Sequence, residues 1–235
     1  MPNIDIASMS MRDAVDMNKK ARKILATDPR IENLDYVDEL SRISALVLKR
    51  FRESEGAGGP AEGNLGNALL IRGEAKLRMA QAIVVYGPGE GSGEDAILKE
   101  CEEILVRAGR SFRSVLRERQ DDTRALLAWG KALSIRGEAS MSPSGDRAVA
   151  LRLYEAAEEK FRTLMEIEPN RVGSMVNAAD AALKVYRLSG DLDVRQSALS
   201  RARATYIEVL RLSAGNVEAS RGLDVCEQLR MTGSG

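Results

Sequence analysis

The sequence predicts an all-α fold, a stack of helical hairpins with about nine or ten helices. Apolar residues recur at steps of three and four along most of the 235-residue chain, the spacing that a buried helix face requires. Alanine, leucine, glutamate and arginine dominate the composition, which favours helix over strand. All six prolines fall at the ends of these apolar segments or in the turns between them, where a helix stops.

The pattern is clearest in residues 123–170. A first apolar stripe occupies Leu126, Leu127, Trp129 and Leu133, and the segment MSPSG at 141–145 interrupts it. A second stripe runs through residues 153–167, and Pro169 ends it. Gly130 lies inside the first stripe, where glycine lowers helix stability unless a neighbouring helix must approach closely. We therefore predict two paired helices, with small residues packed against the bulky rings of the adjoining pair.

Two further segments repeat this pattern. LLIRGEAKL at 69–77 aligns with LLAWGKALS at 126–134, and MVNAADAAL at 175–183 takes the same place in a third unit. An aromatic residue follows in each unit, and these residues are 49 and 45 positions apart: Phe112, Phe161 and Tyr206. The repetition predicts three hairpin units with these bounds: 61–122, 123–170 and 171–214.

Helices flank the three units on both sides. Residues 9–27 and 31–53 predict an N-terminal helical hairpin within a segment 1–55, and EGAGGP at 55–60 predicts a flexible turn or short linker. After the third unit, Asn216 can cap a last helix at about 217–230. This helix, in a segment 215–231, would cover the exposed end of the stack.

The central segment resembles the tetratricopeptide repeat family, whose pattern is W-x2-L-G-x2-Y, then A-x3-F, then P. The matching residues are Leu126, Trp129, Gly130, Leu133, Ala157, Phe161 and Pro169. Gly130 and Ala157 are 27 residues apart, where the standard repeat leaves about 12. The resemblance implies a right-handed α-α superhelix with lengthened hairpins, which binds protein or peptide partners on its concave side.

Partner-binding positions follow from the same resemblance, because first helices of the repeats line the concave side. The small residue of the pattern is Gly73, Gly130 or Ala179 in the three units. The positions three before it and one after it are Leu70, Glu74, Leu127, Lys131, Val176 and Asp180. Only Asn177 agrees with the clamp that reads chaperone tails, so the positions favour a partner segment with apolar side chains. In the alternative interpretation, the apolar residues of this set are simply packed beneath the lengthened hairpins.

Charge gives a second hypothesis. Lysine plus arginine equals aspartate plus glutamate at 35 each, so no overall field attracts nucleic acid or an anionic membrane. Arginines nevertheless recur along the predicted helix 94–120, at Arg107, Arg110, Arg113 and Arg117. They indicate a patch for nucleic acid or an acidic partner, or else a solvated face paired with nearby glutamates.

Catalytic and metal chemistry is largely excluded by what the sequence lacks. The chain has no histidine, which rules out Ser-His-Asp and Cys-His catalysis, and two cysteines cannot form a four-cysteine zinc site. The run GPGEGSGED at 87–95 precedes a helix, but it lacks the Gly-Lys-Ser/Thr ending of a phosphate-binding loop and no strand precedes it. We predict an inter-helix loop there, and no enzyme activity, cofactor or metal site.

The remaining expectations concern cellular context and function. No segment approaches the roughly 20 apolar residues that span a bilayer, and the first residues do not resemble a secretory signal. Cys101 and Cys226 fall on apolar helical faces, which predicts buried thiols and a reducing intracellular compartment, the cytoplasm or an organelle interior. The leading hypothesis is a protein-binding scaffold, adaptor or assembly factor, and a further alternative is a structural subunit that oligomerises.

Overall fold

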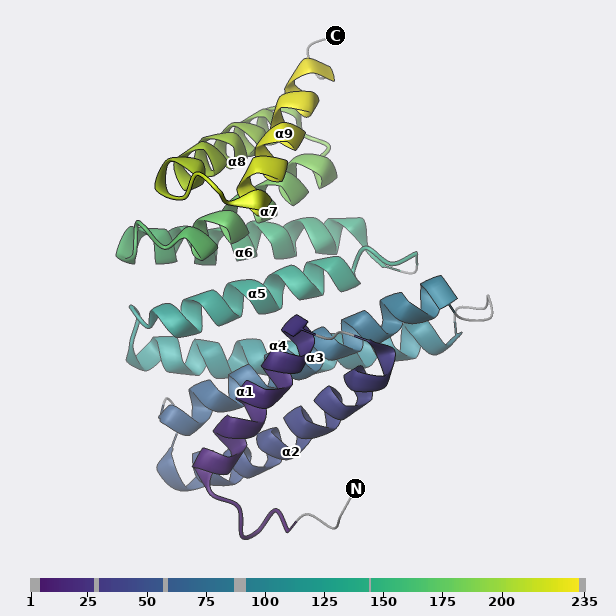
Figure 1. The fold of residues 1–235 in the computed structure, drawn as a ribbon, viewed down its shortest axis with the longest axis vertical. Helices are drawn as coiled ribbons and strands as arrows, with labels where there is room; N and C mark the ends of the chain where they lie inside the picture. Colours follow the sequence, from purple (N-terminus) through teal and green to yellow (C-terminus); the bar gives the residue numbers. More distant parts are fainter. Residues whose placement is uncertain (1–4, 28–29, 57–58, 87–91, 144, 233–235) are drawn as a thin grey trace. The chain divides into compact units, whose positions relative to one another are not determined.

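The computed structural model describes residues 5–27, 30–56, 59–86, 92–143 and 145–232. Within these ranges it contains nine helices and no strand (Figure 1). The helices are α1 (Met11–Thr27), α2 (Ile31–Glu55), α3 (Pro60–Tyr86), α4 (Ser92–Glu118), α5 (Thr123–Ala139), α6 (Arg147–Ile167), α7 (Val172–Leu188), α8 (Leu192–Leu212) and α9 (Val217–Thr232). The predicted all-α fold is therefore confirmed.

Helix ends follow local sequence chemistry. Gly56 ends α2 with a φ of 86°, a conformation that glycine adopts without steric cost. Asp146 and Asp191 cap α6 and α8 by accepting hydrogen bonds from backbone N–H groups of the first turn. As predicted, Asn216 caps α9, because its Oδ1 accepts from the Ala219 N–H at 2.8 Å.

Two predicted loops fall partly outside the described residues. Residues 57–58 of EGAGGP and residues 87–91 of the glycine-rich run lie outside them. The rest of the glycine-rich run is helical, since residues 92–95 form the first turn of α4. Glu94 and Asp95 lie in that turn, where negative charge interacts favourably with the helix dipole.

The chain divides into two compact units after Ala139. Unit 1 comprises α1 to α5, and unit 2 comprises α6 to α9. The division falls between α5 and α6, within the predicted hairpin 123–170. The three-hairpin organisation and the right-handed superhelix stay predictions.

Unit 1 is built around α3 and α4, which lie side by side (Figure 1). Helix α2 packs against α3, and α5 packs against both α3 and α4. Two glycines of α3 allow the close approach of α4: a Cβ on Gly66 would lie 2.6 Å from the Phe112 ring, and one on Gly73 would lie 2.4 Å from Leu105. Gly73 is the glycine of the repeat pattern. Its neighbour, Leu105, belongs to the same predicted hairpin, 61–122, whereas we predicted contact with an aromatic ring of the adjoining hairpin.

Unit 2 packs its helices in chain order, α6 with α7, α7 with α8, and α8 with α9. Tyr206 lies at the centre of one cluster, and a Cβ on Gly222 of α9 would lie 2.3 Å from its ring. Phe112, Phe161 and Tyr206 are each at most 1% exposed. The sequence pattern therefore identified these three core rings correctly.

An ion-pair network joins α2, α3 and α4 in unit 1. Arg72 of α3 contacts Asp38 of α2 and Glu100 of α4, each at 2.7 Å. Lys76, one turn further along α3, contacts the same two carboxylates at 3.1 and 2.9 Å. Burial lowers the pKa of Lys76, but its contacts with Glu100 and Asp38 outweigh that effect and raise the pKa above its ordinary value.

Both cysteines are buried and free, as predicted. Burial raises the pKa of the Cys101 thiol to about 12 and that of the Cys226 thiol to about 11. The Cys101 Sγ–H also donates to the Gly73 carbonyl oxygen at 3.2 Å. Both residues act as small packing groups of the two cores.

Candidate functional site

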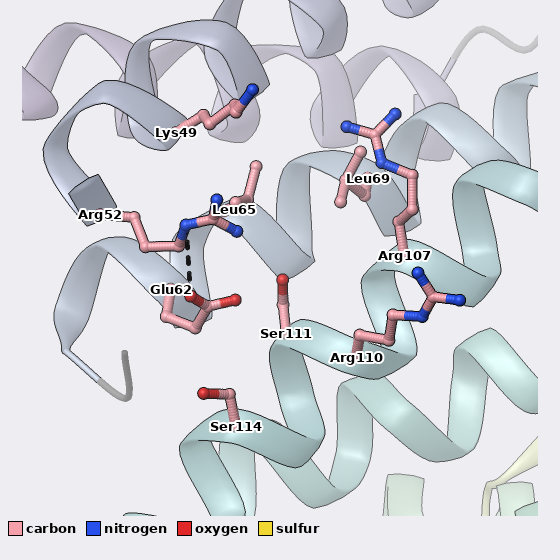
Figure 2. A pocket seen from close by; sticks show the side chains of 9 residues that line it. All are labelled: Lys49, Arg52, Glu62, Leu65, Leu69, Arg107, Arg110, Ser111 and Ser114. Carbon is pink, nitrogen blue, oxygen red and sulfur yellow. Dashed lines mark ion pairs between the residues drawn. The ribbon is translucent and has the colours of Figure 1, made fainter. Parts of the chain in front are cut away.

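Helices α2, α3 and α4 enclose a pocket of about 530 Å³ in unit 1 (Figure 2). Its lining combines cations, hydroxyls and leucines around a single carboxylate. The lining residues are Lys49, Arg52, Glu62, Leu65, Leu69, Arg107, Arg110, Ser111 and Ser114.

Helical spacing explains why each helix contributes a compact set of side chains. Lys49 and Arg52 are three residues apart near the end of α2, and so share one face. Leu65 and Leu69 are four apart on α3 and are buried, so they form an apolar floor. On α4 the lining positions 107, 110, 111 and 114 form one stripe at steps of three and four.

The cations of the pocket exceed its carboxylates. Four cations line the pocket, and Glu62 is the one acidic residue among the lining residues that the structure describes. Arg107 and Arg110 are exposed and form no ion pair with any residue that the structure describes. The pocket therefore concentrates positive charge in a chain whose net charge is zero, and the charge of its two α4 arginines is available to a ligand.

The two cations of α2, Lys49 and Arg52, form only long ion pairs with carboxylates of the described residues. The Lys49 Nζ lies 4.0 Å from the Glu53 carboxylate, and both side chains are more than half exposed, so this pair contributes little. The Arg52 Nε lies 3.7 Å from Glu62 Oε2, which is longer than a hydrogen bond. Glu62 is only 4% exposed, so Arg52 is the partner that compensates a buried carboxylate.

Two serine hydroxyls complete the site. Ser111 is 4% exposed and Ser114 is half-buried. Among the described residues neither hydroxyl has a hydrogen-bond partner, whereas the Ser134 hydroxyl donates to the Gly130 carbonyl of its own helix at 3.1 Å. Figure 2 shows Arg52 and Glu62 on one side, Arg107 and Arg110 on the other, and the Ser111 hydroxyl between them. Both hydroxyls can therefore donate to a bound anion.

The arginine row predicted on α4 divides into two groups. Arg107 and Arg110 line the pocket. Arg113 lies over the Trp129 ring of α5 at 5.6 Å, a cation–π contact, and Arg117 is exposed in the last turn of the helix. The structure thus brings two of the four predicted arginines into one site.

The predicted groove residues lie in different environments. Leu70 and Val176 are 2% and 4% exposed, the packed positions of the alternative interpretation, and so offer a partner no surface. Leu127 and Lys131 are half-buried on α5. The Glu74 carboxylate accepts a hydrogen bond from Arg78 at 2.6 Å.

Asp180, the last predicted groove residue, is exposed on α7 of unit 2. Its carboxylate nevertheless lies against the core, where it accepts a hydrogen bond from the Tyr206 hydroxyl. Burial of the carboxylate raises the pKa of Asp180, although the Tyr206 hydrogen bond opposes the shift. This residue therefore has a structural partner within its own unit.

Unit 2 has its own groove of about 460 Å³, lined by residues of α7, α8 and α9. Leu192 is 62% exposed there. Its arginines already have partners: Arg203 and Arg230 share the Glu227 carboxylate at 2.6 and 3.1 Å, and Arg195 lies over the Tyr186 ring at 4.8 Å. This groove has less free charge than the unit 1 pocket, which is therefore the stronger candidate site.

Sequence reasoning did not identify Lys49, Arg52, Ser111 or Ser114 as site residues. The spacing of Lys49 and Arg52 places them on one helix face, but only the packing of α2 and α4 around α3 turns that face toward Arg107. Within the described residues, no three histidine, cysteine, aspartate or glutamate side chains gather where they could hold a metal ion. No helix in that part of the chain is long and apolar enough to cross a membrane.

No protein-family model matches the chain, and no curated protein matches it. Among solved structures, the chain is similar to the C-terminal part of a TPR repeat-containing protein from Cytophaga hutchinsonii, with 13% sequence identity. The match covers 83% of this chain and 99% of that one, with a TM-score of 0.15. A likeness at that TM-score indicates nothing about function.

Proposed function

We propose that the chain is a non-enzymatic binding protein, an adaptor or assembly factor, and that its unit 1 pocket receives an acidic segment of a protein partner. The observation that carries the proposal is the position of Arg107 and Arg110, two exposed arginines without an ion pair among the described residues, on one pocket wall. Arginine binds carboxylates through paired hydrogen bonds. The pocket thus presents strong donors without an acceptor of their own.

The lining of the pocket favours a protein segment over nucleic acid. Leu65 and Leu69 are almost fully buried, so they exclude water from the floor of the pocket, where its cations interact more strongly with a carboxylate. Among the residues that the structure describes, no aromatic side chain lines the pocket, so these residues provide no platform on which a base could stack.

A binding measurement with a matched variant tests the proposal. The probes are a fluorescent peptide of alternating glutamate and leucine and a single-stranded oligonucleotide of similar length, both followed by anisotropy. The double variant Arg107→Gln/Arg110→Gln should bind the peptide at least about 100-fold more weakly, because hydrogen bonds to charged groups contribute about 1.5–3 kcal/mol each and about 1.4 kcal/mol corresponds to a tenfold change in affinity. Arg117→Gln is the control, since Arg117 is exposed on the same helix outside the pocket lining.

Three results would contradict the proposal. Equal binding of the peptide by the double variant and by Arg117→Gln would exclude the pocket as the site. Tighter binding of the oligonucleotide, with affinity that falls steeply as salt rises, would indicate a nucleic-acid function instead. A molar mass that rises with concentration in light scattering, without peptide binding, would indicate a structural subunit.

A further inference from the structure

We propose that the unit 1 pocket selects a phosphorylated side chain of its protein partner, a phosphate monoester, over a carboxylate. This inference rests on the function proposed above and specifies the partner's chemistry. It follows from the charge of the pocket, from its hydrogen-bond donors and from the arrangement of its two serines.

Charge is the first argument. Among the described lining residues, the four cations (Lys49, Arg52, Arg107 and Arg110) exceed the single carboxylate of Glu62 by three charges. One carboxylate would neutralise one of them. A phosphate monoester carries about −1.5 to −2 charges at pH 7. It therefore neutralises more of the excess positive charge of the pocket than a carboxylate does.

Hydrogen-bond donors are the second argument. Six of the nine lining residues can donate, and Glu62 is the one lining side chain that can only accept when it is ionised. A carboxylate has two oxygens for these donors, whereas a phosphate monoester has three strong acceptor oxygens. The donor set is thus larger than a carboxylate can satisfy.

The serines are the third argument. Ser111 and Ser114 are three residues apart on α4, and so their hydroxyls lie on the same helix face as the arginine stripe. A neutral hydroxyl adds little to the capture of a carboxylate that two guanidinium groups already bind. Beside a phosphate it supplies the donor for an oxygen that the arginines leave unsatisfied.

The test compares peptides that differ at one central residue. Short fluorescent peptides with leucine flanks carry phosphoserine, glutamate or serine at that position and are titrated with the 235-residue chain. We expect the phosphoserine peptide to bind at least about tenfold more tightly than the glutamate peptide, and the serine peptide to bind most weakly. Ser111→Ala/Ser114→Ala should weaken binding of the phosphoserine peptide and leave the glutamate peptide unchanged.

A matched serine variant and a melting curve exclude a general effect on the fold. Ser54 lies on α2 outside the pocket lining, and its hydroxyl donates to the Phe51 carbonyl of its own helix at 2.7 Å. Ser54→Ala should leave the affinity for all three peptides unchanged. Melting curves of the variants by circular dichroism should match that of the parent protein.

The pH dependence gives an independent readout. Phosphoserine loses its dianionic form as the pH falls through about 6, and the affinity for this peptide should fall with it. The chain has no histidine, and the ordinary pKa values of lysine, arginine and glutamate lie outside this range. The charged groups that face the ligand from α2, α3 and α4 are Lys49, Arg52, Glu62, Arg107 and Arg110. Binding of the glutamate peptide should not change over this range, because an exposed glutamate side chain titrates at about pH 4.3.

Each contrary result has a separate meaning. Equal affinity for the phosphoserine and glutamate peptides overturns the phosphate selectivity but leaves the acidic-segment function intact. Absence of binding to both overturns the proposed function as well. Inorganic phosphate that binds as tightly as the phosphoserine peptide would make the pocket a free-anion site, and an oligonucleotide that does so would make it a nucleic-acid site; either result overturns the inference.

Discussion

Gly66 shows how one missing side chain positions a whole helix. A Cβ at this position would lie 2.6 Å from the buried Phe112 ring, far inside van der Waals contact. Glycine in a helix costs stability relative to alanine. Here that cost is offset by the close packing of α3 on α4, the two helices that carry the floor and the arginine wall of the pocket.

Substitution of Gly66 should therefore reverse the usual helix preference. Gly66→Ala gains about 1 kcal/mol of helix propensity, but overpacking against the ring costs about 1–3 kcal/mol, so we expect a net loss of stability. Gly63→Ala is the matched control on the same helix, because its Cβ would have ordinary contact with Val115 at 3.8 Å; it should stabilise by about 0.5 kcal/mol. Urea unfolding measures both, and a Gly66→Ala protein as stable as Gly63→Ala would contradict the prediction.

Asp180 gives a pH-dependent prediction. Its folded pKa is raised above the ordinary value of 3.8, chiefly by burial. The folded state thus binds this proton more tightly than the unfolded chain does, so the stabilising contribution is complete below pH 3.8 and is lost as the pH rises through the folded pKa. Asp180→Asn lacks this contribution.

Thermal unfolding at several pH values measures the effect. The melting temperature of the parent protein relative to Asp180→Asn should be highest in acid and should decline toward neutral pH. A constant difference between the two proteins across this range would contradict the raised pKa.

At the scale of the element, the ion-pair network holds α2, α3 and α4 in the arrangement that forms the pocket. Asp38 is 17% exposed and bridges Arg72 and Lys76. Each of its oxygens has a cation as a partner, and the same two cations contact Glu100 of α4. Closed networks of this kind contribute more than isolated surface pairs.

Removal of one charge should destabilise unit 1. Asp38→Asn leaves Arg72 and Lys76 with a single shared carboxylate, and we expect a loss of about 1–3 kcal/mol in the free energy of unfolding. Asp35→Asn is the control on the same helix: Asp35 is exposed and forms no ion pair with the described residues, so it should change stability by less than about 0.5 kcal/mol. Equal effects of the two variants would show that the network contributes nothing.

The sequence predicted elements well because helix signals are local. Apolar periodicity located α1, α2 and α9 to within about two residues, and the aromatic positions identified buried rings. It did not predict that Gly73 contacts Leu105, because the contact depends on how two helices face each other. The pocket could not be predicted for the same reason. Arg52 and Arg107 are distant in the sequence, and only the packing of three helices brings them into one pocket.

At the scale of the whole molecule, the chain divides into two compact units. The cluster around Phe112 draws on unit 1, and the cluster around Tyr206 draws on unit 2. Compact regions with their own cores can generally fold alone. The pocket lies entirely in unit 1.

We therefore expect a fragment of residues 1–139 to fold and to retain peptide binding. Its unfolding in urea, followed by circular dichroism, should be cooperative. A fragment of residues 1–110 is the control; it should not fold, because it lacks Phe112 and Val115 of α4, which belong to the unit 1 core. Non-cooperative unfolding of the longer fragment would show that unit 1 depends on the rest of the chain.

The burial of both native thiols has a practical consequence for such experiments. Maleimide reagents attack the thiolate, and Cys101 and Cys226 are fully buried with pKa values far above neutral. A cysteine introduced on the exposed surface can thus be labelled selectively in the otherwise natural chain. A dye at position 117, just beyond the pocket on α4, would report the arrival of a ligand by a change in its fluorescence, without any fluorophore on the ligand itself.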